Sequence, residues 1–379
     1  MGTIEAGTSR TGARRRIVVT DKDRDRAWSK LQAKRKEILL EGMTPEGVRA
    51  GASVESWMSE WLAIRARVVR PKTYALEEGM SRKWIIPTLG RVKLEQISPA
   101  DVRRLTSRIV DEGRSTTTAR TVQRILLQAL KAALAEGHQV PQRILLTKAP
   151  AKAVGTRTAI PVDDAIRLLD AARETPDAAR WVAALLQGMR QGEVLGLTWE
   201  CVDLQAGTLD VSWQLQELRY KDRDRGTFQV PDTYEARQLH GALHLVRPKT
   251  SAGYRLIPLV PWMSAALQAL ADAHPRRPHE LVFPRDESGL PRVPAQDRAA
   301  WKRLQERAGV SKPDGSAYVL HEARHTTATL LLAAGVDPEV IKTIMGHSNI
   351  VTTHGYQHVS QTMARQALEK VAVSLQLVE

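Results

Sequence analysis

The chain has 379 residues, which is enough for two or three domains of about 150 residues each. Hydrophobic residues make up 42% of it and charged residues 26%, a composition that supports packed cores and argues against a disordered chain. The single cysteine, Cys201, excludes an internal disulfide framework and a cysteine-based zinc cluster, and it is typical of a reducing compartment.

The net charge of +14 is concentrated in the front part of the chain. Residues 1–150 contain 29 Lys and Arg against 16 Asp and Glu, whereas residues 151–379 contain 27 against 26. This asymmetry favours nucleic acid as the partner of the front part, and a charge that only keeps the protein in solution is the alternative. No segment is long and apolar enough to predict a membrane span, and the arginines at 14–16 are not followed by the apolar core of a secretory signal.

The front part is predicted to be mainly helical. Residues 1–13 are small and polar, and we expect them to be disordered. A basic segment at 14–47 contains a predicted strand at 14–19, a helix that begins near residue 23, and a linker at its end. Hydrophobic residues at helical spacing then predict a domain at 52–146 with helices at about 53–65, 71–84, 99–112 and 116–136. Ile86-Pro87 is expected to break the pattern after the second of these helices.

The back part is predicted to mix helices with strands. A linker rich in Lys, Ala and Gly at 147–158 separates it from the front part. The domain at 159–361 shows helical spacing at about 161–173, 177–187, 191–198, 262–273, 295–308, 322–334 and 337–345. Alternating segments predict strands at 208–216, 243–248 and 253–259, with a charged excursion at 217–240 between the first two.

One local match points to a metal site. His321-Glu322-Ala323-Arg324-His325 fits the H-E-x-x-H pattern of zinc metalloproteases, in which two histidines on one helix face bind the metal and the glutamate is the base. His347 is available as a third ligand. A five-residue pattern with two free positions recurs by chance, however, and a peptidase has no need of a basic front part.

Five motifs scattered over the back part indicate a different chemistry. In chain order they are Gly188-Met189-Arg190-Gln191-Gly192-Glu193, Lys249 in a turn between two predicted strands, His321-x-x-Arg324, Gly346-His347, and Thr353-His354-Gly355-Tyr356. In this order and at about this spacing, the chain resembles the tyrosine recombinase (phage integrase) family. Pro71-x-Thr73 and Ile86-Pro87-x-Leu89-Gly90 are similar to that family's core-binding domain, so the resemblance covers about residues 52–365.

These residue types suit the breakage of a phosphodiester bond. A tyrosine hydroxyl is a nucleophile whose phenolate also leaves readily, so the strands can be rejoined without ATP. Arginines are planar, permanently charged donors of paired hydrogen bonds to a phosphate. A lysine with a lowered pKa can protonate the leaving oxygen. Each of these residues alone could be an ordinary surface ion pair or a solvated turn residue. Five motifs in the order of one family are not explained by such ordinary roles.

The resemblance implies a fold and a reaction. The fold is a mainly α front half with a helical SAM-like core-binding domain, joined to an α+β catalytic domain, and together they form a C-shaped clamp around DNA. In the reaction, Tyr356 attacks a DNA phosphate and forms a 3′-phosphotyrosyl link. The implied roles of the other residues are stabilisation of the phosphorus by Arg190, Arg324 and His347, protonation of the leaving oxygen by Lys249, general acid–base assistance by His321, and support of Arg190 by Glu193.

The resemblance also implies partners and further site residues. We expect a homotetramer on duplex attachment sites in the bacterial cytoplasm at the nucleoid, with residues 362–379 exchanged between protomers. A host DNA-bending protein and a directionality factor are possible accessories, and no metal or nucleotide cofactor is expected. Residues 14–41 would correspond to the last strand and helix of the arm-binding domain of lambda-type integrases. The expected DNA-binding residues are Arg14, Arg15, Arg16, Lys72, Thr73, Arg82, Lys83, Arg120 and Arg124.

Three alternatives stay open. A type IB topoisomerase uses similar chemistry on one duplex, although the core-binding motifs favour a recombinase. A non-catalytic DNA-binding protein would keep the basic front part but has no need of Tyr356 and its partners. A zinc peptidase would depend on His321 and His325, and a chelator would inhibit it.

Overall fold

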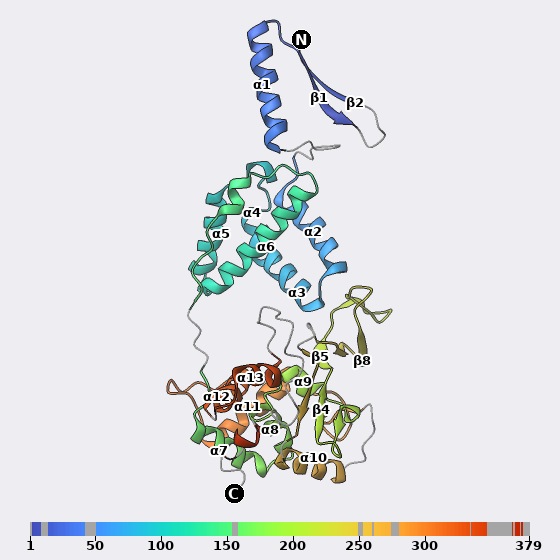
Figure 1. Ribbon diagram of the computed structural model, residues 1–379, viewed down its shortest axis with the longest axis vertical. Coiled ribbons are helices and arrows are strands. Elements are labelled where there is room, and N and C mark those ends of the chain that lie inside the picture. The colour runs from blue at the N-terminus through green and yellow to red at the C-terminus, as the bar shows by residue number, and fades with distance from the viewer. Residues whose placement is uncertain are drawn as a thin grey trace. The chain divides into compact units, whose positions relative to one another are not determined.

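The computed structural model describes residues 2–8, 14–41, 51–153, 158–248, 253–259, 261–273, 280–333, 335–346, 366, 368–371 and 373. Contacts divide the chain into two compact units, one of Met1–Val154 with Val230–Asp232 and one of Gly155–Gln229 with Thr233–Glu379 (Figure 1). The first unit holds the N-terminal hairpin and a helical bundle, and the second holds the remaining helices and the small sheets. The predicted fold class, a helical front part followed by an α+β domain, is confirmed.

The N-terminus forms a hairpin and a helix. Strand β1 (Gly2–Thr8) pairs antiparallel with β2 (Arg14–Val19), and helix α1 (Arg24–Glu41) follows. The prediction of disorder at 1–13 is therefore wrong for residues 2–8. Ile4 lies opposite Ile17 and Thr3 opposite Val18 in the backbone register, so this segment becomes a strand through pairing with the next one.

A bundle of helices forms the rest of the first unit. Its long helices are α2 (Val54–Val68), α3 (Pro71–Met80), α5 (Pro99–Asp111) and α6 (Thr116–Ala135), with 3₁₀ turns at Leu94–Gln96 and Gln142–Leu146. Serine side chains cap the N-termini of α2, α5 and α6, which satisfies backbone N–H groups that have no partner inside the helix. Trp57 of α2 is 1% exposed and donates its indole N–H to the carbonyl of Ala129 in α6, 2.7 Å away, which fixes these two helices together.

Proline 87 does not break the second helix where we expected. After α3 the backbone makes a π-helical turn at Ser81–Ile85 and continues as α4 (Ile86–Leu89). The N–H of Ile86 donates to the carbonyl of Ser81, five residues back, so the turn is one residue wider than in an α-helix. The wide turn gives room to Pro87, whose ring would otherwise meet the preceding turn and which has no N–H to donate.

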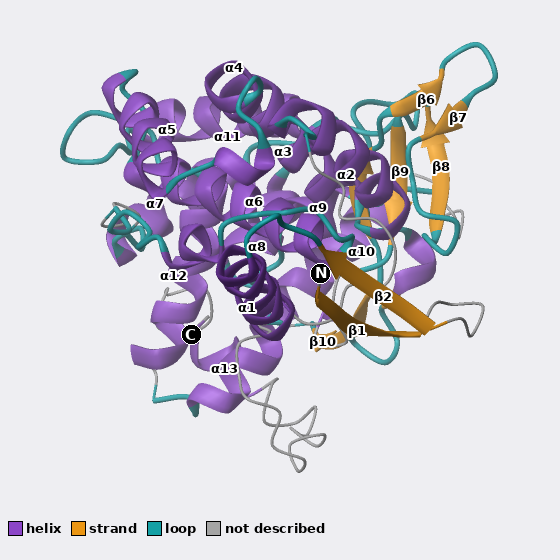
Figure 2. Ribbon diagram, turned by 90° about the horizontal axis from the view of Figure 1, so that it is seen from above, coloured by secondary structure: helices purple, strands orange, loops and turns teal. Residues whose placement is uncertain are grey.

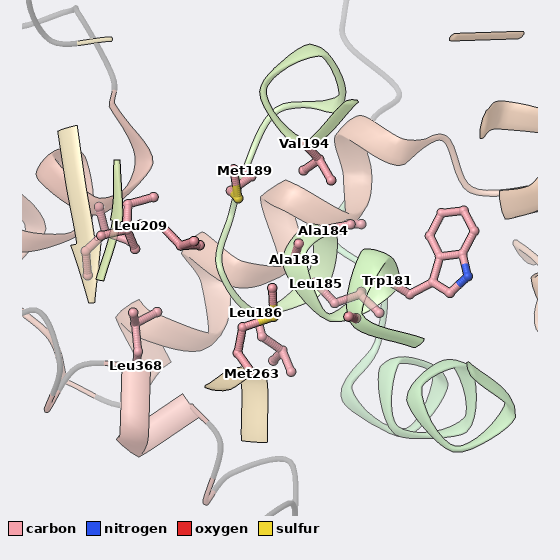
Figure 3. Packing of buried hydrophobic residues seen from close by; sticks show 14 of the residues in the cluster. Trp181, Ala183, Ala184, Leu185, Leu186, Met189, Val194, Leu209, Met263 and Leu368 are labelled. Carbon is pink, nitrogen blue, oxygen red and sulfur yellow. The ribbon is translucent and has the colours of Figure 1, made fainter. Parts of the chain in front are cut away.

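The second unit packs its helices around one hydrophobic core. The helices are α7 (Val162–Arg173), α8 (Ala178–Leu185), α9 (Gln191–Leu195), α10 (Pro261–Ala273), α11 (Pro294–Ala308), α12 (Leu320–Ala333) and α13 (Pro338–Met345). Figure 3 shows the side chains of α8 in this core together with Met263 of α10 and Leu209. Both α9 and α12 pack against this core. The N-terminus of α9 and one face of α12 carry predicted site residues.

The strands of the second unit form several small antiparallel sheets. Strand β4 (Thr208–Val211) pairs with β10 (Arg255–Pro258) and β3 (Val202–Asp203), whereas β5 (Gln214–Glu217) pairs with β9 (Leu243–Val246), which also pairs with β8 (Ala236–His240). The single strand predicted at 208–216 is thus two strands in different sheets. The charged excursion is partly ordered, since it contains β8 and the short hairpin of β6 (Tyr220–Asp222) and β7 (Thr227–Phe228) (Figure 2).

Part of the C-terminal segment packs on its own chain. Helical backbone is described at 366, 368–371 and 373, and Leu368 and Val371 are 2% and 1% exposed within the hydrophobic core of the second unit. Figure 3 includes Leu368 among the side chains of this core. Exchange of residues 362–379 between protomers stays a prediction, and these two side chains would have to leave the core for it to occur. Within the described part of the chain, none of the helices is long and apolar enough to span a membrane.

Candidate catalytic site

Arg190 is held at the N-terminus of α9 by its own neighbours. Its backbone N–H and its Nη1 donate to the two carboxylate oxygens of Glu193, at 2.8 and 2.7 Å, and its Nη2 donates to the carbonyl of Gly346 at 2.6 Å. The side chain of Arg190 is 38% exposed, whereas that of Glu193 is 4% exposed. Glu193 therefore acts as a buried anchor, and the guanidinium of Arg190 keeps a face toward solvent.

Glycine 188 shapes the turn that leads to Arg190. Its φ of +57° lies in the left-handed region, which favours glycine, and a Cβ there would come 2.5 Å from the Sδ of Met345. The turn before α9 therefore packs directly against the end of α13. A further glycine, Gly196, lets α9 lie against β5, because a Cβ at this position would be 2.5 Å from the backbone nitrogen of Leu215.

A second arginine, Arg255 of β10, shares the carboxylate of Glu193. Its Nη2 and Nη1 donate to the two oxygens at 2.8 and 3.1 Å, and its Nε donates to the carbonyl of Ile344 at 2.8 Å. Burial alone would raise the pKa of Glu193, but the hydrogen bonds and charges of Arg255 and Arg190 lower it to about 2. Glu193 is therefore ionised at neutral pH.

Arg324 lies on α12 and is the most deeply buried arginine of the predicted set. It is 3% exposed, and its two terminal nitrogens donate to the carbonyls of Gly188 and Met345. Burial and the charges of Arg190 and Arg255 lower the pKa of Arg324 to about 9, and it is still a cation at pH 7. Positive charge is thus concentrated beside Arg190 with Glu193 as its one carboxylate partner in the described contacts, an arrangement that suits the binding of an anion.

The metal-like motif at the start of α12 is built differently from a zinc site. Glu322 is 0% exposed; it accepts hydrogen bonds from the N–H of Val319 and Thr158 and pairs with Lys312 at 2.9 Å. Burial would raise the pKa of Glu322, but Lys312 and these N–H groups hold it below its ordinary value. Glu322 is therefore a structural anchor for the start of α12 rather than a base facing a metal.

The two histidines of the motif are both exposed on α12. The rings of His321 and His325 meet edge to face with centroids 4.7 Å apart. Among the residues that the structure describes, no group of three or more His, Cys, Asp or Glu side chains could hold a metal ion. His321, expected to assist proton transfer, is thus one turn before the buried Arg324 at the surface of the same helix.

A buried ion pair fixes the helix that begins after Arg190. Arg180 of α8 and Asp297 of α11 are 1% and 0% exposed and form a bidentate pair at 2.9 and 2.6 Å. Gln191, the first residue of α9, donates to the same carboxylate at 2.8 Å and to the carbonyl of Pro294 at 3.0 Å. Three helices are therefore joined at the residue next to Arg190.

Three of the predicted catalytic residues, Lys249, His347 and Tyr356, lie outside the described residues. The strand that leads to Lys249 is anchored, since Arg247 lies 3.8 Å from the ring centroid of Trp213 and pairs with Glu235 of the excursion at 2.9 Å. Gly346, the residue before His347, has a φ of +60° and ends α13 in a left-handed cap.

The predicted DNA-binding residues of the bundle are exposed. Lys72 lies at the start of α3 and Arg82 and Lys83 lie in the π-helical turn, while Thr73 is half-buried. Arg120 and Arg124 lie one turn apart on α6. Arg14, Arg15 and Arg16 lie in β2, and their side chains are outside the described set.

The two arginines of α6 line a groove in the bundle. The groove has a volume of about 730 Å³ and runs between α6 and the segment that follows the bundle. Lys131 and Lys152 also line it, and none of the described lining residues is acidic. Arg120 donates to the carbonyl of Pro150 at 3.1 Å, which holds the far wall in place. The groove is therefore positively charged on both walls.

Sequence reasoning missed Arg255, although a signal for it exists. In Arg255-Leu256-Ile257-Pro258 the first and third residues are buried and the second is exposed, as strand alternation requires. A charged residue in register with the inward-facing Ile257 has to find a buried partner. Glu193, the only acidic residue of the Gly188–Glu193 motif, is that partner.

A helical front unit followed by a domain with these paired arginines is the architecture of a site-specific tyrosine recombinase. The family model described as "Phage integrase family" matches residues 159–363, and the model described as "Phage integrase, N-terminal SAM-like domain" matches residues 53–109. Because the first match covers more than half of the chain, the protein belongs to the phage integrase family.

Individual relatives agree with this assignment. An "Integrase" of Saccharopolyspora erythraea is 26% identical over 84% of this chain and 82% of its own length. A "Tyrosine recombinase XerC-like" protein of Caldanaerobacter subterraneus subsp. tengcongensis is 24% identical over 89% of this chain and 88% of its own.

Solved structures share the fold. The Tn1549 transposon integrase in complex with transposon right end DNA has a TM-score of 0.64 and 22% identity, covering 84% of this chain and 99% of its own. The lambda integrase tetramer bound to a Holliday junction has a TM-score of 0.57 and 17% identity, covering 93% of this chain and 94% of its own. These matches do not favour the topoisomerase, non-catalytic or peptidase alternatives.

Proposed function

We propose that the protein cuts and rejoins duplex DNA at attachment sites through a 3′-phosphotyrosyl intermediate. The observation that carries the proposal is the pair of guanidiniums of Arg190 and Arg324, held beside each other by backbone carbonyls and by the buried Glu193. Such fixed donors stabilise the charge that develops on the non-bridging oxygens when a phosphodiester is attacked.

The chemical steps follow from the residue types. The hydroxyl oxygen of Tyr356 attacks the phosphorus, the bond to the 5′ oxygen breaks, and Lys249 gives that oxygen a proton. Arg190, Arg324 and His347 stabilise the pentacoordinate phosphorus, and His321, as general base, takes up the proton that the tyrosine hydroxyl loses. Attack of a 5′ hydroxyl from another strand reverses the step and releases Tyr356, so the bond energy is conserved and no cofactor is required.

The bundle supplies the non-specific part of DNA binding. Arg120 and Arg124 together with the lysines of the groove present charge to the phosphate backbone, which explains why the excess positive charge lies in the front part of the chain. We propose that both units contact the same duplex as a clamp and that the N-terminal hairpin and α1 contact a second class of DNA site.

The working assembly is proposed to be a homotetramer on two duplexes. The lambda integrase tetramer bound to a Holliday junction supports this assembly for a protein of the same fold. Exchange of residues 362–379 between protomers, a DNA-bending protein and a directionality factor would belong to this assembly, which we place in the bacterial cytoplasm at the nucleoid. Integration and excision of a phage or another mobile element is the proposed outcome.

The test is the covalent adduct. The full chain is incubated with nicked duplexes tiled across the DNA that flanks its gene, and protein–DNA adducts are resolved by denaturing electrophoresis. Tyr356→Phe is expected to abolish the adduct and to leave DNA affinity nearly unchanged, because only the nucleophilic oxygen is removed. An adduct of normal yield in this variant would overturn the assignment of the nucleophile.

A further inference from the structure

Three arginines from three elements bind three successive carbonyls at the end of α13. Arg255 of β10 donates to Ile344, Arg324 of α12 donates to Met345, and Arg190 before α9 donates to Gly346. The last carbonyls of a helix have no partner inside the helix and carry its negative dipole end. The end of α13 is therefore the common support of the whole arginine array.

Arg255 differs from Arg190 in how many of its guanidinium nitrogens donate hydrogen bonds within the protein. The side chain of Arg255 is 5% exposed and makes four hydrogen bonds, to both oxygens of Glu193 and to the carbonyls of Ile344 and Gly253. The side chain of Arg190 is 38% exposed and makes two, to Glu193 and Gly346. All three guanidinium nitrogens of Arg255 donate to Glu193 and to main-chain carbonyls, whereas the described contacts of Arg190 use only its two terminal nitrogens, so Arg190 keeps a donor for a phosphate and Arg255 is directed inward.

We propose that Arg255 is a positioning residue of the cleavage reaction, which fixes the guanidinium of Arg190 through Glu193 and fixes the end of α13 through Ile344. The inference rests on the proposed function, since it requires that Arg190 binds the scissile phosphate. One carboxylate connects the two arginines: Glu193 accepts from Arg255 on one side and from the N–H and Nη1 of Arg190 on the other.

The charges around Glu193 explain why a second arginine is needed. Glu193 is buried, so an unpaired negative charge there would be costly. The groups that face it are Arg190 beside it on the chain, Arg255 from β10, and the nearby charge of Arg324 from α12. Without Arg255, only one partly exposed arginine, Arg190, would donate hydrogen bonds to Glu193, and the orientation of that arginine would be less well fixed.

The test uses a neutral phosphate. A methylphosphonate carries a methyl group in place of one non-bridging oxygen, so it has no charge for an arginine to neutralise. Single-turnover cleavage is measured on a nicked duplex at which the wild type forms its adduct, with either a phosphate or a methylphosphonate at the scissile position. A variant that is defective in stabilising the phosphate charge should lose less cleavage rate, relative to the wild type, on the methylphosphonate than on the phosphate. A variant with a general folding defect should lose the same factor on both substrates.

The expected results are specific. Arg190→Ala and Arg255→Met each lower cleavage of the phosphate by about 100-fold, the usual cost of losing one oriented donor, and both lie within about 10-fold of the wild type on the methylphosphonate. The double variant Glu193→Gln with Arg255→Met is expected to lose no more cleavage activity than the worse of the two single variants, because both substitutions break the same Arg255–Glu193–Arg190 contact. Arg255→Lys, which keeps the charge but not the paired geometry, falls between the wild type and Arg255→Met.

The matched control is Arg292→Met. Arg292 forms a similar bidentate pair, to Asp177 at 2.7 and 3.0 Å, and is 11% exposed. This variant is expected to lower the melting temperature and to leave the ratio of the two cleavage rates unchanged. If Arg255→Met does not fold, Arg255→Lys and the double variant with Glu193→Gln carry the comparison.

Three results would overturn the inference. Equal impairment of the Arg255 variants on phosphate and methylphosphonate would make Arg255 a purely structural residue. Additive losses in the double variant would show that it does not act through Glu193. If Arg190→Ala is itself not rescued by the methylphosphonate, the proposed role of Arg190 fails first, and the role of Arg255 falls with it.

Discussion

The recombinase and zinc-enzyme hypotheses make opposite predictions for two neighbouring residues of α12, Arg324 and His325. Substituting each residue separately therefore distinguishes the two hypotheses. Arg324 is 3% exposed and donates to two carbonyls, whereas His325 is exposed and touches His321. The proposed recombinase mechanism requires Arg324 to bind the phosphate and makes His325 dispensable. In a zinc enzyme of the H-E-x-x-H type, His325 is a ligand and Arg324 is a free position.

The magnitudes follow from the contacts. Arg324→Ala leaves the carbonyls of Gly188 and Met345 without donors, and each buried unsatisfied group costs about 1–3 kcal/mol of folding free energy. Loss of one oriented donor to the transition state costs cleavage about 10²–10³-fold. For the exposed His325→Ala, stability should change by about 0.5 kcal/mol or less, as for other surface substitutions.

The assay is adduct formation on a nicked duplex in the presence of EDTA, with thermal unfolding measured in parallel. Arg324→Lys accompanies Arg324→Ala, because it retains a cation and separates lost catalysis from lost folding. We expect adduct formation to survive EDTA and His325→Ala and to be lost in both Arg324 variants. Inhibition by EDTA together with an essential His325 and a dispensable Arg324 would refute the recombinase interpretation.

Two further predictions concern charge. Since the pKa of Glu193 is about 2 against an ordinary value of 4.5, its pairing stabilises the fold above pH 4.5, and this contribution, about 3 kcal/mol, is lost as the pH falls toward 2. Acid titration followed by circular dichroism should therefore show a wild-type advantage over Glu193→Gln that disappears in this window, and parallel curves would contradict the ion pair. In the bundle, Arg120→Ala with Arg124→Ala should reduce the slope of log K for duplex DNA against log salt by about 2, one unit for each lost phosphate contact. Arg173→Ala, at an exposed arginine of the catalytic unit, is the control, and an unchanged slope in the double variant would remove the groove from the DNA interface.

The sequence alone predicted the secondary structure where local hydrophobic periodicity determines it. The helices of the bundle follow from hydrophobic spacing, and Ser53, Ser98 and Ser115 mark their starts as serine caps do. The sequence alone did not predict the strands whose extent depends on pairing with another segment of the chain. The strand at Gly2–Thr8 depends on pairing with Arg14–Val19, and the division of 208–216 depends on which strands lie beside each half.

The candidate site shows the same limit. Arg190, Arg324 and Glu193 were identified from motif order, because their neighbours in the chain carry the signal. Arg255 was missed, because its partners Glu193 and Ile344 are 62 and 89 residues away along the chain. The zinc motif was misleading because the pattern does not show that Glu322 is buried and paired with Lys312 and with the N–H groups of Val319 and Thr158.

The support of the arginine array by main-chain carbonyls has a consequence for how this site can change during evolution. Every residue type supplies a carbonyl, so Ile344 and Met345 can be replaced by other apolar residues without removing an acceptor from Arg255 or Arg324. The constraint falls instead on the path of the backbone, at the left-handed Gly188 and Gly346 and at the contact between position 188 and Met345. Divergent relatives can therefore keep the same arginine geometry while the sequence of α13 drifts, as long as the helix ends at the same residue.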